Sequence, residues 1–525
     1  MVKKMPLGKN QKIFLFFGFN LVWGIVLWWS ISRYGMGTSR DSAEYLFTSL
    51  SLDKGQGFIS FSGQPFVLWP PLYPILLAVI QCISRLNPYE SAEVLQLITL
   101  FLISFCIAQL FLRAFPNNFW LSFIGNSMAT VGVSMTMLFQ GVGADYLHLL
   151  LILGIVLVGG KYMKDHRIQN IWLMALISAL AMLQRYLGLA VFITSIFLIF
   201  LFPWASSLWV RIKRSLWMGL SIIPVGLWIL NVSTITLQRA PPESFAQNLS
   251  DFTTSILRWF FSNNAMFEHP LRLQAGVWIV WLVLIGSIIL IASLNKQRAY
   301  INNTTLPVIL YGLMYTVTLF GVSAMSFFNK LDDRFVSPMY IPCIFLIMLT
   351  IQVLTEKIRA SRIAWLKLPC SASIAGILLL FLGLTLNQSL QQVFQIRFNG
   401  AGYTSKEWRE NNALKYWQKN APQGNFIVLS NYPSGIVFYT WHEVLPSPRR
   451  SPNPNVKEII YPIEEYAPTL FEAGKKSYLI WIEPNSYSHV YSIDELRQIA
   501  EIKVLYEEED GGVYQLSPLQ NTYTH

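Results

Sequence analysis

Charged residues are scarce in this sequence. They make up 13% of the 525 residues, whereas hydrophobic residues make up 53%, and an average soluble domain carries about 25% charged residues. This composition excludes an ordinary soluble protein and indicates an integral membrane protein. The net charge of +11 does not indicate a nucleic-acid partner, because the Lys and Arg residues lie mostly in short loops between apolar runs, where they act as topology signals.

Cysteine and the common cofactor motifs are also scarce or missing. The four cysteines lie in or beside apolar stretches, and no two have the spacing of a zinc or redox motif. No P-loop, no G-x-G-x-x-G after a strand, no H-E-x-x-H and no G-x-S-x-G is present. These absences argue against a disulfide framework, a nucleotide-driven pump, a serine hydrolase and an enzyme with an organic cofactor.

Long apolar runs are what the sequence has in abundance. A bilayer core needs about 20 apolar residues per helix, and about eleven runs are candidates: 13–31, 92–112, 119–139, 146–160, 171–183, 186–202, 216–237, 276–294, 306–325, 336–354 and 371–386. The first run follows four lysines, as in a signal peptide, but it is long and no small-residue cleavage site follows. We therefore interpret it as a retained first helix.

The basic loops predict the topology. A cytoplasmic N-terminus places every strongly basic short loop on the cytoplasmic side, as the positive-inside rule requires. This agreement holds only if the stretch 69–86 does not cross the bilayer, and its three prolines, Pro70, Pro71 and Pro74, disfavour a regular spanning helix. We expect a juxtamembrane or re-entrant helix there, on the outer side.

The fold class that follows is a polytopic α-helical membrane protein with a small C-terminal α/β domain. We expect a transmembrane domain at 1–387, with a first outer loop and its juxtamembrane helices at 32–86, and a soluble outer-face domain at 388–525. In that domain, hydrophobic patterning predicts one helix and several short strands. The helix is at 406–419, the strands are at 426–429, 478–482, 502–506 and 513–516, and a hairpin turn is at 510–512.

Two acidic residues stand directly after the first apolar run. Asp41 and Glu44 are three residues apart, so they share one face of a short helix. Carboxylates at a membrane edge suit a general base or a metal ligand, although a solvated loop acid has the same spacing. Arg185 and Arg334 fall at outer helix ends, where a guanidinium group either binds phosphate bidentately or reaches the lipid headgroups.

The order of the motifs resembles a known family. The D-x-x-x-Y motif at 41–45 is followed by a G-x-G turn at 55–57 and by W-P-P-L-Y-P-x-L-L-A at 69–78. Asp145 opens a helix, L-Q-R-Y-L-G-L occupies 183–189, and R-F-V-S-P begins at Arg334. This series is similar to that of GT-C glycosyltransferases of the protein O-mannosyltransferase and lipid A aminoarabinose transferase type, which use dolichyl- or undecaprenyl-phosphate sugars.

Six residues are candidates for the site, five of them through the resemblance and Lys330 through its charge and its position in the same loop as Arg334. Asp41 matches the first-loop acid and is the candidate catalytic base, with Glu44 as a second catalytic candidate because Ser42 stands where many relatives have Glu. Arg185, Arg334 and Lys330 are candidates for binding the donor phosphate. Asp145 is interpreted as a metal ligand, a loop-orienting residue or a helix cap. The cofactor is unknown, and a divalent metal ion is compatible with these carboxylates.

The function that the resemblance implies is the transfer of one sugar from a polyprenyl-phosphate donor to a lipid, glycan or protein acceptor at the outer face. The protein would lie in a bacterial plasma membrane, in contact with membrane lipids. The alternative is a transporter or flippase of a lipid-linked saccharide, for which ionisable residues near the bilayer midplane are typical. The glycosyltransferase hypothesis instead predicts that Asp41, Asp145, Arg185 and Arg334 converge at one membrane face.

Overall fold

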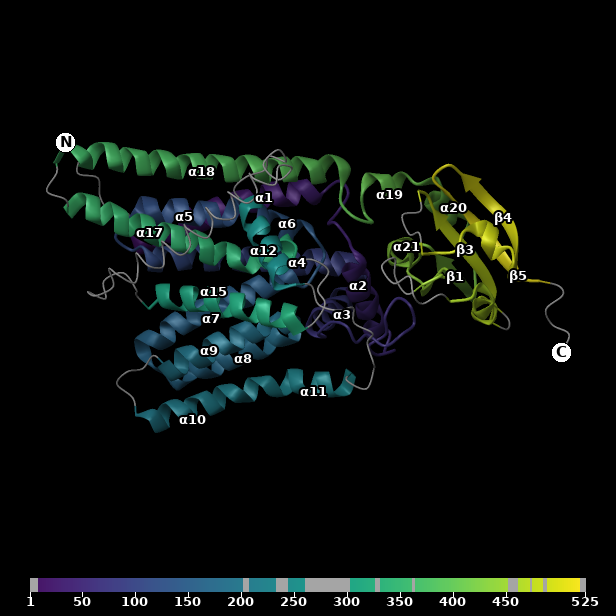
Figure 1. Ribbon diagram of the computed structural model, residues 1–525, viewed down its shortest axis with the longest axis horizontal. Helices are drawn as coiled ribbons and strands as arrows, with labels where there is room; N and C mark the ends of the chain where they lie inside the picture. Colours follow the sequence, from purple (N-terminus) through teal and green to yellow (C-terminus); the bar gives the residue numbers. More distant parts are fainter. Residues whose placement is uncertain are drawn as a thin grey trace.

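The structure is a computed structural model that describes residues 8–201, 207–232, 244–259, 303–325, 331–360, 364–451, 461–472, 475–484 and 489–519. A bundle of roughly parallel and antiparallel helices forms the larger part, and a β-sheet with short helices lies beyond one end of it (Figure 1). The N-terminus lies at the opposite end of the bundle (Figure 1). We call the end that faces the sheet the sheet end of the bundle.

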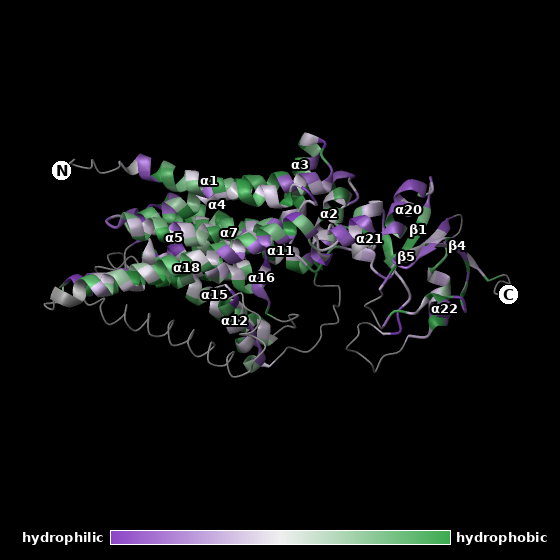
Figure 2. Cartoon of the chain, turned by 90° about the horizontal axis from the view of Figure 1, so that it is seen from above, coloured by the Kyte–Doolittle hydropathy of each residue, from purple (hydrophilic) through white to green (hydrophobic). Residues whose placement is uncertain are grey.

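The bundle consists of helices most of which are apolar along their length (Figure 2). They are α1 (Lys9–Ile31), α4 (Pro88–Ala114), α5 (Phe119–Val131), α6 (Val133–Gln140), α7 (Asp145–Asp165), α8 (Ile168–Gln184), α9 (Leu189–Leu201), α10 (Leu208–Gly219), α11 (Ile223–Val232), α12 (Phe245–Arg258), α15 (Thr305–Met325), α17 (Tyr340–Ala360) and α18 (Ala364–Asn399). Short 3₁₀ turns join some of them, namely η1 (Tyr186–Gly188), η2 (Leu220–Ile222) and η4 (Ser337–Met339).

The described residues contain fewer candidate spans than the sequence predicts. Seven helices are long and apolar enough to cross a membrane, or eight if the bent pair α5 and α6 forms one span. The predicted spans at 171–183 and 186–202 correspond to α8 and α9, which have 17 and 13 residues and are too short to be counted. The predicted span at 276–294 lies outside the described residues.

The predicted span at 119–139 is two helices. The chain bends by 40° between α5 and α6, where Gly132 lies against the ring of Tyr340 so closely that a Cβ atom would overlap it. Tyr340 also donates a 2.8 Å hydrogen bond to the carbonyl of Met128, near the end of α5. This bend directs α6 and the loop after it toward the sheet end.

The first outer loop contains two short helices between the bundle and the sheet (Figure 1). They are α2 (Arg40–Asp53) and α3 (Leu72–Ser84). The 13-residue α3 is not among the candidate spans, in agreement with the prediction for 69–86. Pro71 precedes its first residue and Pro74 lies in its first turn, where the missing backbone donors cost little.

The C-terminal region is built around a mixed five-stranded sheet of order β2-β1-β3-β5-β4. The strands are β1 (Phe426–Ser430), β2 (Val444–Pro446), β3 (Lys476–Ile482), β4 (Ala500–Glu508) and β5 (Gly511–Pro518), with β1 parallel to β2 and β3, and β5 antiparallel to β3 and β4. All four predicted strands and the hairpin turn before β5 are confirmed. Strand β2 has only three residues, and no hydrophobic pattern predicted it.

Several short helices accompany the sheet: α19 (Lys406–Glu410), α20 (Asn412–Asn420), α21 (Pro433–Thr440), η5 (Ile463–Thr469) and α22 (Ile493–Leu496). The single helix predicted at 406–419 is therefore α19 and α20, which meet at Asn411. Asn411 has an extended ψ of 126° and caps α20 by accepting a hydrogen bond from the Leu414 amide at 3.0 Å. An Asn side chain favours such a break because it replaces the missing helical partner.

The sheet region and the first outer loop share one hydrophobic core. Ala43 of α2 and Phe61 are buried together with Ile436, Val437 and Val444 of the sheet region. The last bundle helix, α18, extends past the predicted domain boundary at residue 387 and ends at Asn399. The loop that follows, through Gly402, therefore returns to the first outer loop at the sheet end.

Candidate active site

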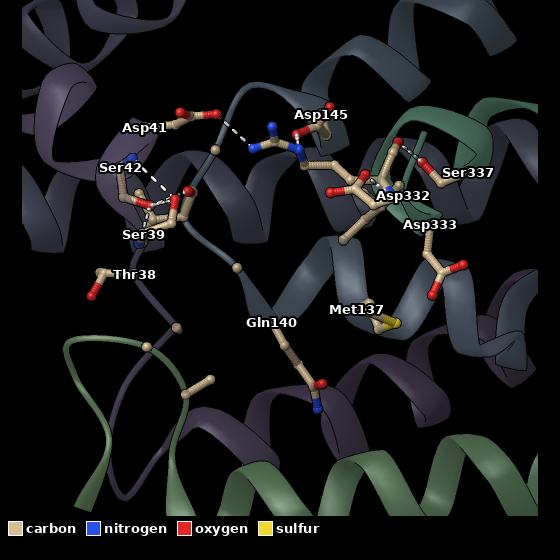
Figure 3. Close-up of a pocket in the computed structure, with 18 of the residues that line it drawn as sticks. Thr38, Ser39, Asp41, Ser42, Met137, Gln140, Asp145, Asp332, Asp333 and Ser337 are labelled. Atoms are coloured by element: carbon tan, nitrogen blue, oxygen red, sulfur yellow. Dashed lines mark hydrogen bonds and ion pairs between the residues drawn. The ribbon is translucent and has the colours of Figure 1, made fainter. Parts of the chain in front are cut away.

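The first carboxylate of the site stands at the start of α2. Ser39 caps this helix: its hydroxyl accepts from the Ser42 amide at 3.4 Å, while the Ser42 hydroxyl accepts from the Ser39 amide at 2.9 Å. Ser42 also donates to the carbonyl of Val142 at 2.7 Å, in the loop before α7. These contacts fix the first turn of α2, so Asp41 points toward the loop before α7 (Figure 3).

The second carboxylate opens α7. The loop before it is held against the first outer loop, because the amide of Gly37 donates to Gln140 at 2.7 Å and the amide of Val142 donates to Gly37 at 2.9 Å. Gln184, the last residue of α8, donates to the carbonyl of Ala144 at 2.9 Å. Asp145 therefore has a fixed position between α2 and the end of α8.

A short helix, α16 (Asp333–Val336), presents the second arginine. Asp332 caps it by accepting from the amides of Arg334 at 3.0 Å and Phe335 at 3.3 Å. The hydroxyl of Ser337 donates to the carbonyl of Arg334 at 2.7 Å and closes the turn. This cap directs the Arg334 side chain toward α2 and α7.

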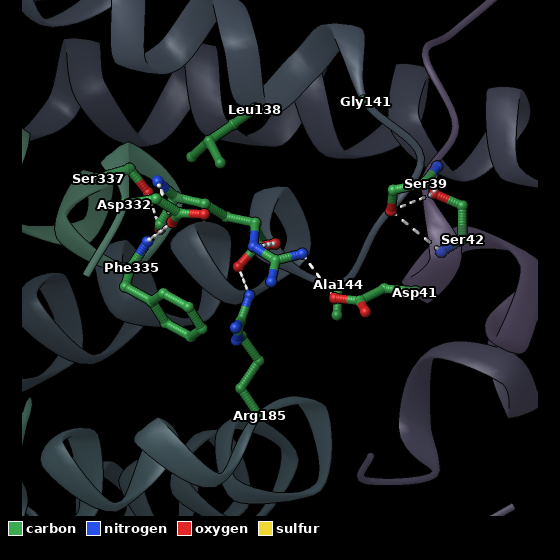
Figure 4. Close-up of polar contacts among 12 residues, drawn as sticks. Ser39, Asp41, Ser42, Leu138, Gly141, Ala144, Arg185, Asp332, Phe335 and Ser337 are labelled. Atoms are coloured by element: carbon green, nitrogen blue, oxygen red, sulfur yellow. Dashed lines mark hydrogen bonds and ion pairs between the residues drawn. The ribbon is translucent and has the colours of Figure 1, made fainter. Parts of the chain in front are cut away.

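The four residues predicted to converge do so. Nη1 of Arg334 lies 2.6 Å from Oδ2 of Asp41, although the two residues are 293 positions apart in the chain. Nε of Arg334 lies 3.9 Å from Oδ2 of Asp145, and Nη1 of Arg185 is paired with Oδ1 of the same carboxylate. We call these four residues the ion-pair cluster; Figure 4 shows Asp41 and Arg185, two members of this cluster, with dashed lines for its ion pairs.

The ion-pair cluster is partly withdrawn from solvent. The Asp145 and Arg185 side chains are 14% and 16% exposed, whereas those of Asp41 and Arg334 are 24% and 36% exposed. Burial, and next the charge of Arg334, lower the pKa of Arg185; its guanidinium group nevertheless stays charged, because arginine ordinarily titrates above about pH 12. Two guanidinium groups held this close favour an anion between or beside them.

A cavity of about 490 Å³ adjoins the cluster, which is within the range of about 300–1,000 Å³ that small-molecule sites occupy. Asp41, Asp145 and Arg334 line one part of it. Figure 3 shows these polar groups together with Met137 and Gln140 of α6. The other residues that line the cavity include Gln392 and Ile396 of α18, and Ala401 and Gly402 from the loop after α18. The cavity is thus charged at one end and is lined elsewhere by α6 and α18 of the bundle.

Glu44 does not line this cavity. It lies on α2 with 5% of its surface exposed, and burial raises the pKa of its carboxyl group, against the opposing effects of a Ser60 hydrogen bond and the Arg40 charge. Three residues correspond to about 300° around a helix, so Asp41 and Glu44 are displaced by about 60°. That angle is enough for Asp41 to face the cavity and Glu44 the packing between α2 and Ser60.

Of the two remaining candidates, Lys330 and Asp145, the structure describes only Asp145. Lys330 and the neighbouring outer-loop residues 326–329 lie outside the described residues. Asp145, proposed as a metal ligand or loop-orienting residue, has both carboxylate oxygens next to arginines. Across the described ranges, no group of three His, Cys, Asp or Glu side chains is arranged to hold a metal ion.

Sequence reasoning missed several residues that shape the site. Ser39, Ser42 and Asp332 act as helix caps, and a serine or aspartate directly before a helix is a signal that identifies such caps. Gln392 and Ile396 of α18 had no such signal, since that segment was assigned to the outer domain. Phe335 was recognised only as part of a motif, although its ring lies next to both arginines of the cluster.

Comparison with known proteins gives a likeness of fold. No protein-family model and no curated protein sequence matches the chain. Among solved structures, ArnT from Cupriavidus metallidurans bound to undecaprenyl phosphate is similar over 97% of this chain and 98% of its own, with a TM-score of 0.57 at 12% identity. The apo state of that protein matches 95% of this chain and 97% of its own, with a TM-score of 0.57 at 11% identity.

The archaeal oligosaccharyltransferase AglB from Archaeoglobus fulgidus, in complex with an inhibitory peptide and a dolichol-phosphate, is also similar. It matches over 98% of this chain and 75% of its own, with a TM-score of 0.54 at 11% identity. The fold is GT-C-like. At these identities the likeness establishes the fold alone, and the particular relative and its substrates do not carry over from it.

Proposed function

We propose that the protein is a glycosyltransferase that transfers one sugar from a polyprenyl-phosphate donor to an acceptor at the outer face of the membrane. The observation that carries this proposal is the ion-pair cluster, which adjoins a cavity at the sheet end of the bundle. The structures of similar fold include one bound to undecaprenyl phosphate and one bound to a dolichol-phosphate, which supports a lipid-linked donor.

The cluster offers the groups that such a transfer requires. The acceptor hydroxyl attacks the anomeric carbon, the bond from that carbon to the phosphate oxygen breaks, and the acceptor proton passes to Asp41 as the base. The departing polyprenyl phosphate gains negative charge, which Arg334 and Arg185 stabilise by charge-assisted hydrogen bonds. A single displacement of this kind inverts the anomeric configuration.

The site also suits a donor with a membrane-embedded tail. The charged end of the cavity and the apolar helix α6, through Met137 and Leu138, line the same space, so a phosphate group binds at the cluster while its chain stays in the bilayer. A transporter would place its ionisable residues near the middle of the membrane. Here the four that converge lie at one end of the bundle.

We also propose an orientation in the membrane and a place for the sheet region. The N-terminus and the sheet region lie at opposite ends of the molecule (Figure 1), and the basic loops favour a cytoplasmic N-terminus. The sheet region, which follows the end of α18 at Asn399, then lies outside, next to the site, where it has access to an acceptor lipid, glycan or protein. The membrane would be the bacterial plasma membrane.

Transfer of labelled sugar from polyprenyl-phosphate donors tests the function directly. In membranes with matched expression we expect D41N to lower transfer by about 100-fold or more, because an amide cannot accept the acceptor proton. The control is D494N, the same change at a carboxylate that is 93% exposed in the sheet region, which should transfer like wild type. Unchanged transfer by D41N would remove Asp41 as the base, and no transfer by the wild type with any donor would contradict the proposed function.

A further inference from the structure

Both guanidinium groups of the ion-pair cluster lie next to one aromatic ring. Cζ of Arg185 is 5.3 Å from the centroid of the Phe335 ring, and Cζ of Arg334 is 5.2 Å from the same centroid. Cations within about 6 Å of a ring centroid are attracted by the negative charge on the ring face. Figure 4 shows the ring directed toward Arg185 and the cluster.

A ring in this position offsets part of the repulsion between the two guanidinium groups. Two guanidinium groups repel each other, and Asp145 is the carboxylate that they share, with Arg185 at Oδ1 and Nε of Arg334 3.9 Å from Oδ2. The second carboxylate, Asp41, contacts Arg334 at 2.6 Å and would accept a proton during transfer. At that moment the two arginines lose one of their two negative partners, while the ring stays in place.

The position of the ring is fixed by its own backbone. The hydroxyl of Tyr315 on α15 donates to the carbonyl of Phe335 at 2.6 Å. The amide of Phe335 donates to the Asp332 cap at 3.3 Å. The ring is therefore held from both sides of its peptide, by α15 and by the cap of α16, and it provides a rigid surface for two flexible side chains.

We infer that Phe335 is a positioning residue, whose ring holds Arg185 and Arg334 together so that both contact the phosphate group of a polyprenyl-phosphate ligand. This inference rests on the proposed function and adds a residue to it. Phe335 itself touches neither the sugar nor the acceptor; it acts through the two arginines. Without the ring, the guanidinium groups separate and phosphate binding weakens.

The predicted effect is on donor affinity more than on turnover. For F335L we expect the Kd for a polyprenyl phosphate without sugar, and the KM for the sugar donor, to rise about tenfold, which corresponds to about 1.4 kcal/mol. The kcat should change by less than about threefold, because Asp41 keeps its own position on α2. F335Y and F335W should bind like wild type, since they keep a π face.

A second substitution without a ring tests whether the shape of leucine, rather than the missing ring face, weakens binding. F335M also lacks a ring face and has about the volume of leucine, with an unbranched and more adaptable side chain, so it should be as weak as F335L. The control is F58L, the same change at a half-buried ring that packs on Trp228 with centroids 5.0 Å apart, outside the cavity. Binding is measured on the purified full-length protein in detergent by equilibrium dialysis with labelled undecaprenyl phosphate, and the thermal unfolding midpoint of each variant is recorded.

The outcomes are distinct. Weak binding by F335L and F335M, with wild-type binding by F335Y, F335W and F58L at similar unfolding midpoints, supports the inference. Binding by F335L that equals wild type, or full rescue by F335M, overturns it and leaves the donor proposal standing. If the wild type itself does not bind undecaprenyl phosphate, the phosphate site of the proposed function fails, and the inference fails with it.

Discussion

At the scale of single residues, charge pairing controls the site. The paired side chains of Arg334 and Asp41 are 36% and 24% exposed. Such partly solvated ion pairs contribute about 1 kcal/mol or less to stability. The pair is therefore a weak stabiliser of the fold. Its position in a cavity wall gives it a different use, because a phosphate that binds Arg334 competes with Asp41 and leaves that carboxylate available as a base.

Loss of the Arg334 charge should therefore affect transfer much more than folding. For R334M we expect kcat/KM to fall by about 100-fold or more, since a positioned donor to the leaving oxygen is removed, with a small change in unfolding midpoint. R113M is the matched control, because Arg113 lies in the last turn of α4 and its Nε donates a 3.3 Å hydrogen bond to Gln109 rather than lining the cavity. Normal transfer by R334M would contradict the phosphate role.

Glu44 predicts a pH-dependent stability. Burial raises its pKa above the ordinary value of 4.5 in the folded protein, so the folded state binds the proton more tightly than the unfolded state. Wild-type stability then decreases as pH rises from about 4.5 through the folded pKa and is constant above it. E44Q stays neutral, so it should be more stable than wild type at pH 7.5 and nearly equal to it at pH 4.

Thermal unfolding of the purified protein at the two pH values measures this difference. A higher midpoint for E44Q at pH 7.5 only would identify Glu44 as a buried group that packs α2 against the Ser60 segment. The transfer assay provides the complementary result. Transfer that disappears in E44Q, with an unchanged midpoint at both pH values, would instead support the catalytic role that the sequence assigned to Glu44.

At the scale of elements, close approaches between helix ends position the charged groups. Gly188 in η1 lies directly against the backbone of Ala181 and Met182 in α8, where an added Cβ atom would overlap main-chain atoms. The amide of Gly188 also donates to the carbonyl of Arg185 at 2.8 Å. This tight turn between α8 and α9 therefore determines where Arg185 stands.

A single methyl group tests the turn. G188A should lower the free energy of unfolding by about 1–3 kcal/mol through overpacking, and it should also reduce transfer because Arg185 moves with η1. G226A is the control, since no atom lies within 4 Å of the Cβ position at Gly226 in α11. There alanine should stabilise the helix by about 0.5–1 kcal/mol. Equal stability of G188A and G226A would show that the turn is not tightly packed.

At the scale of the whole molecule, the sheet region and the membrane bundle meet at the first outer loop. The hydroxyl of Thr404 donates to Met36 at 2.7 Å, and the Arg409 side chain donates to Tyr34 at 2.9 Å. Thr38 and Gly402 form a parallel β-bridge. Because Thr38 is three residues before Asp41, the position of the candidate base depends on a segment more than 350 residues later in the chain.

Disruption of the bridge tests this dependence. Gly402 has a φ of +56°, and a Cβ atom there would overlap the carbonyl of Thr38, so G402V should displace the first outer loop. A displacement of about 1 Å can cost about 100-fold in rate, and we expect a loss of that order in the transfer assay. G424V is the control, because Gly424 also has a positive φ, +98°, but no atom lies within 4 Å of its Cβ position.

The expected result separates backbone strain from loss of the bridge. Both variants force a side chain into a left-handed conformation, which costs about 1–2 kcal/mol, so both should show a lower unfolding midpoint. Transfer should fall in G402V alone. Equal transfer by the two variants would mean that the sheet region does not position the site.

Sequence patterns alone predicted the class of protein, most helices of the bundle and four of the five strands of the sheet. These are local properties, since run length and a period of two residues depend on a few neighbouring positions. Together with the resemblance of its motifs to a known family, the sequence also indicated Asp41, Asp145, Arg185 and Arg334. The tertiary structure decided that Arg334 meets Asp41 across 293 residues, that Glu44 turns away, and that Phe335 lies against both arginines. Those contacts depend on helix bends and on packing between distant segments, which no local pattern in the sequence encodes.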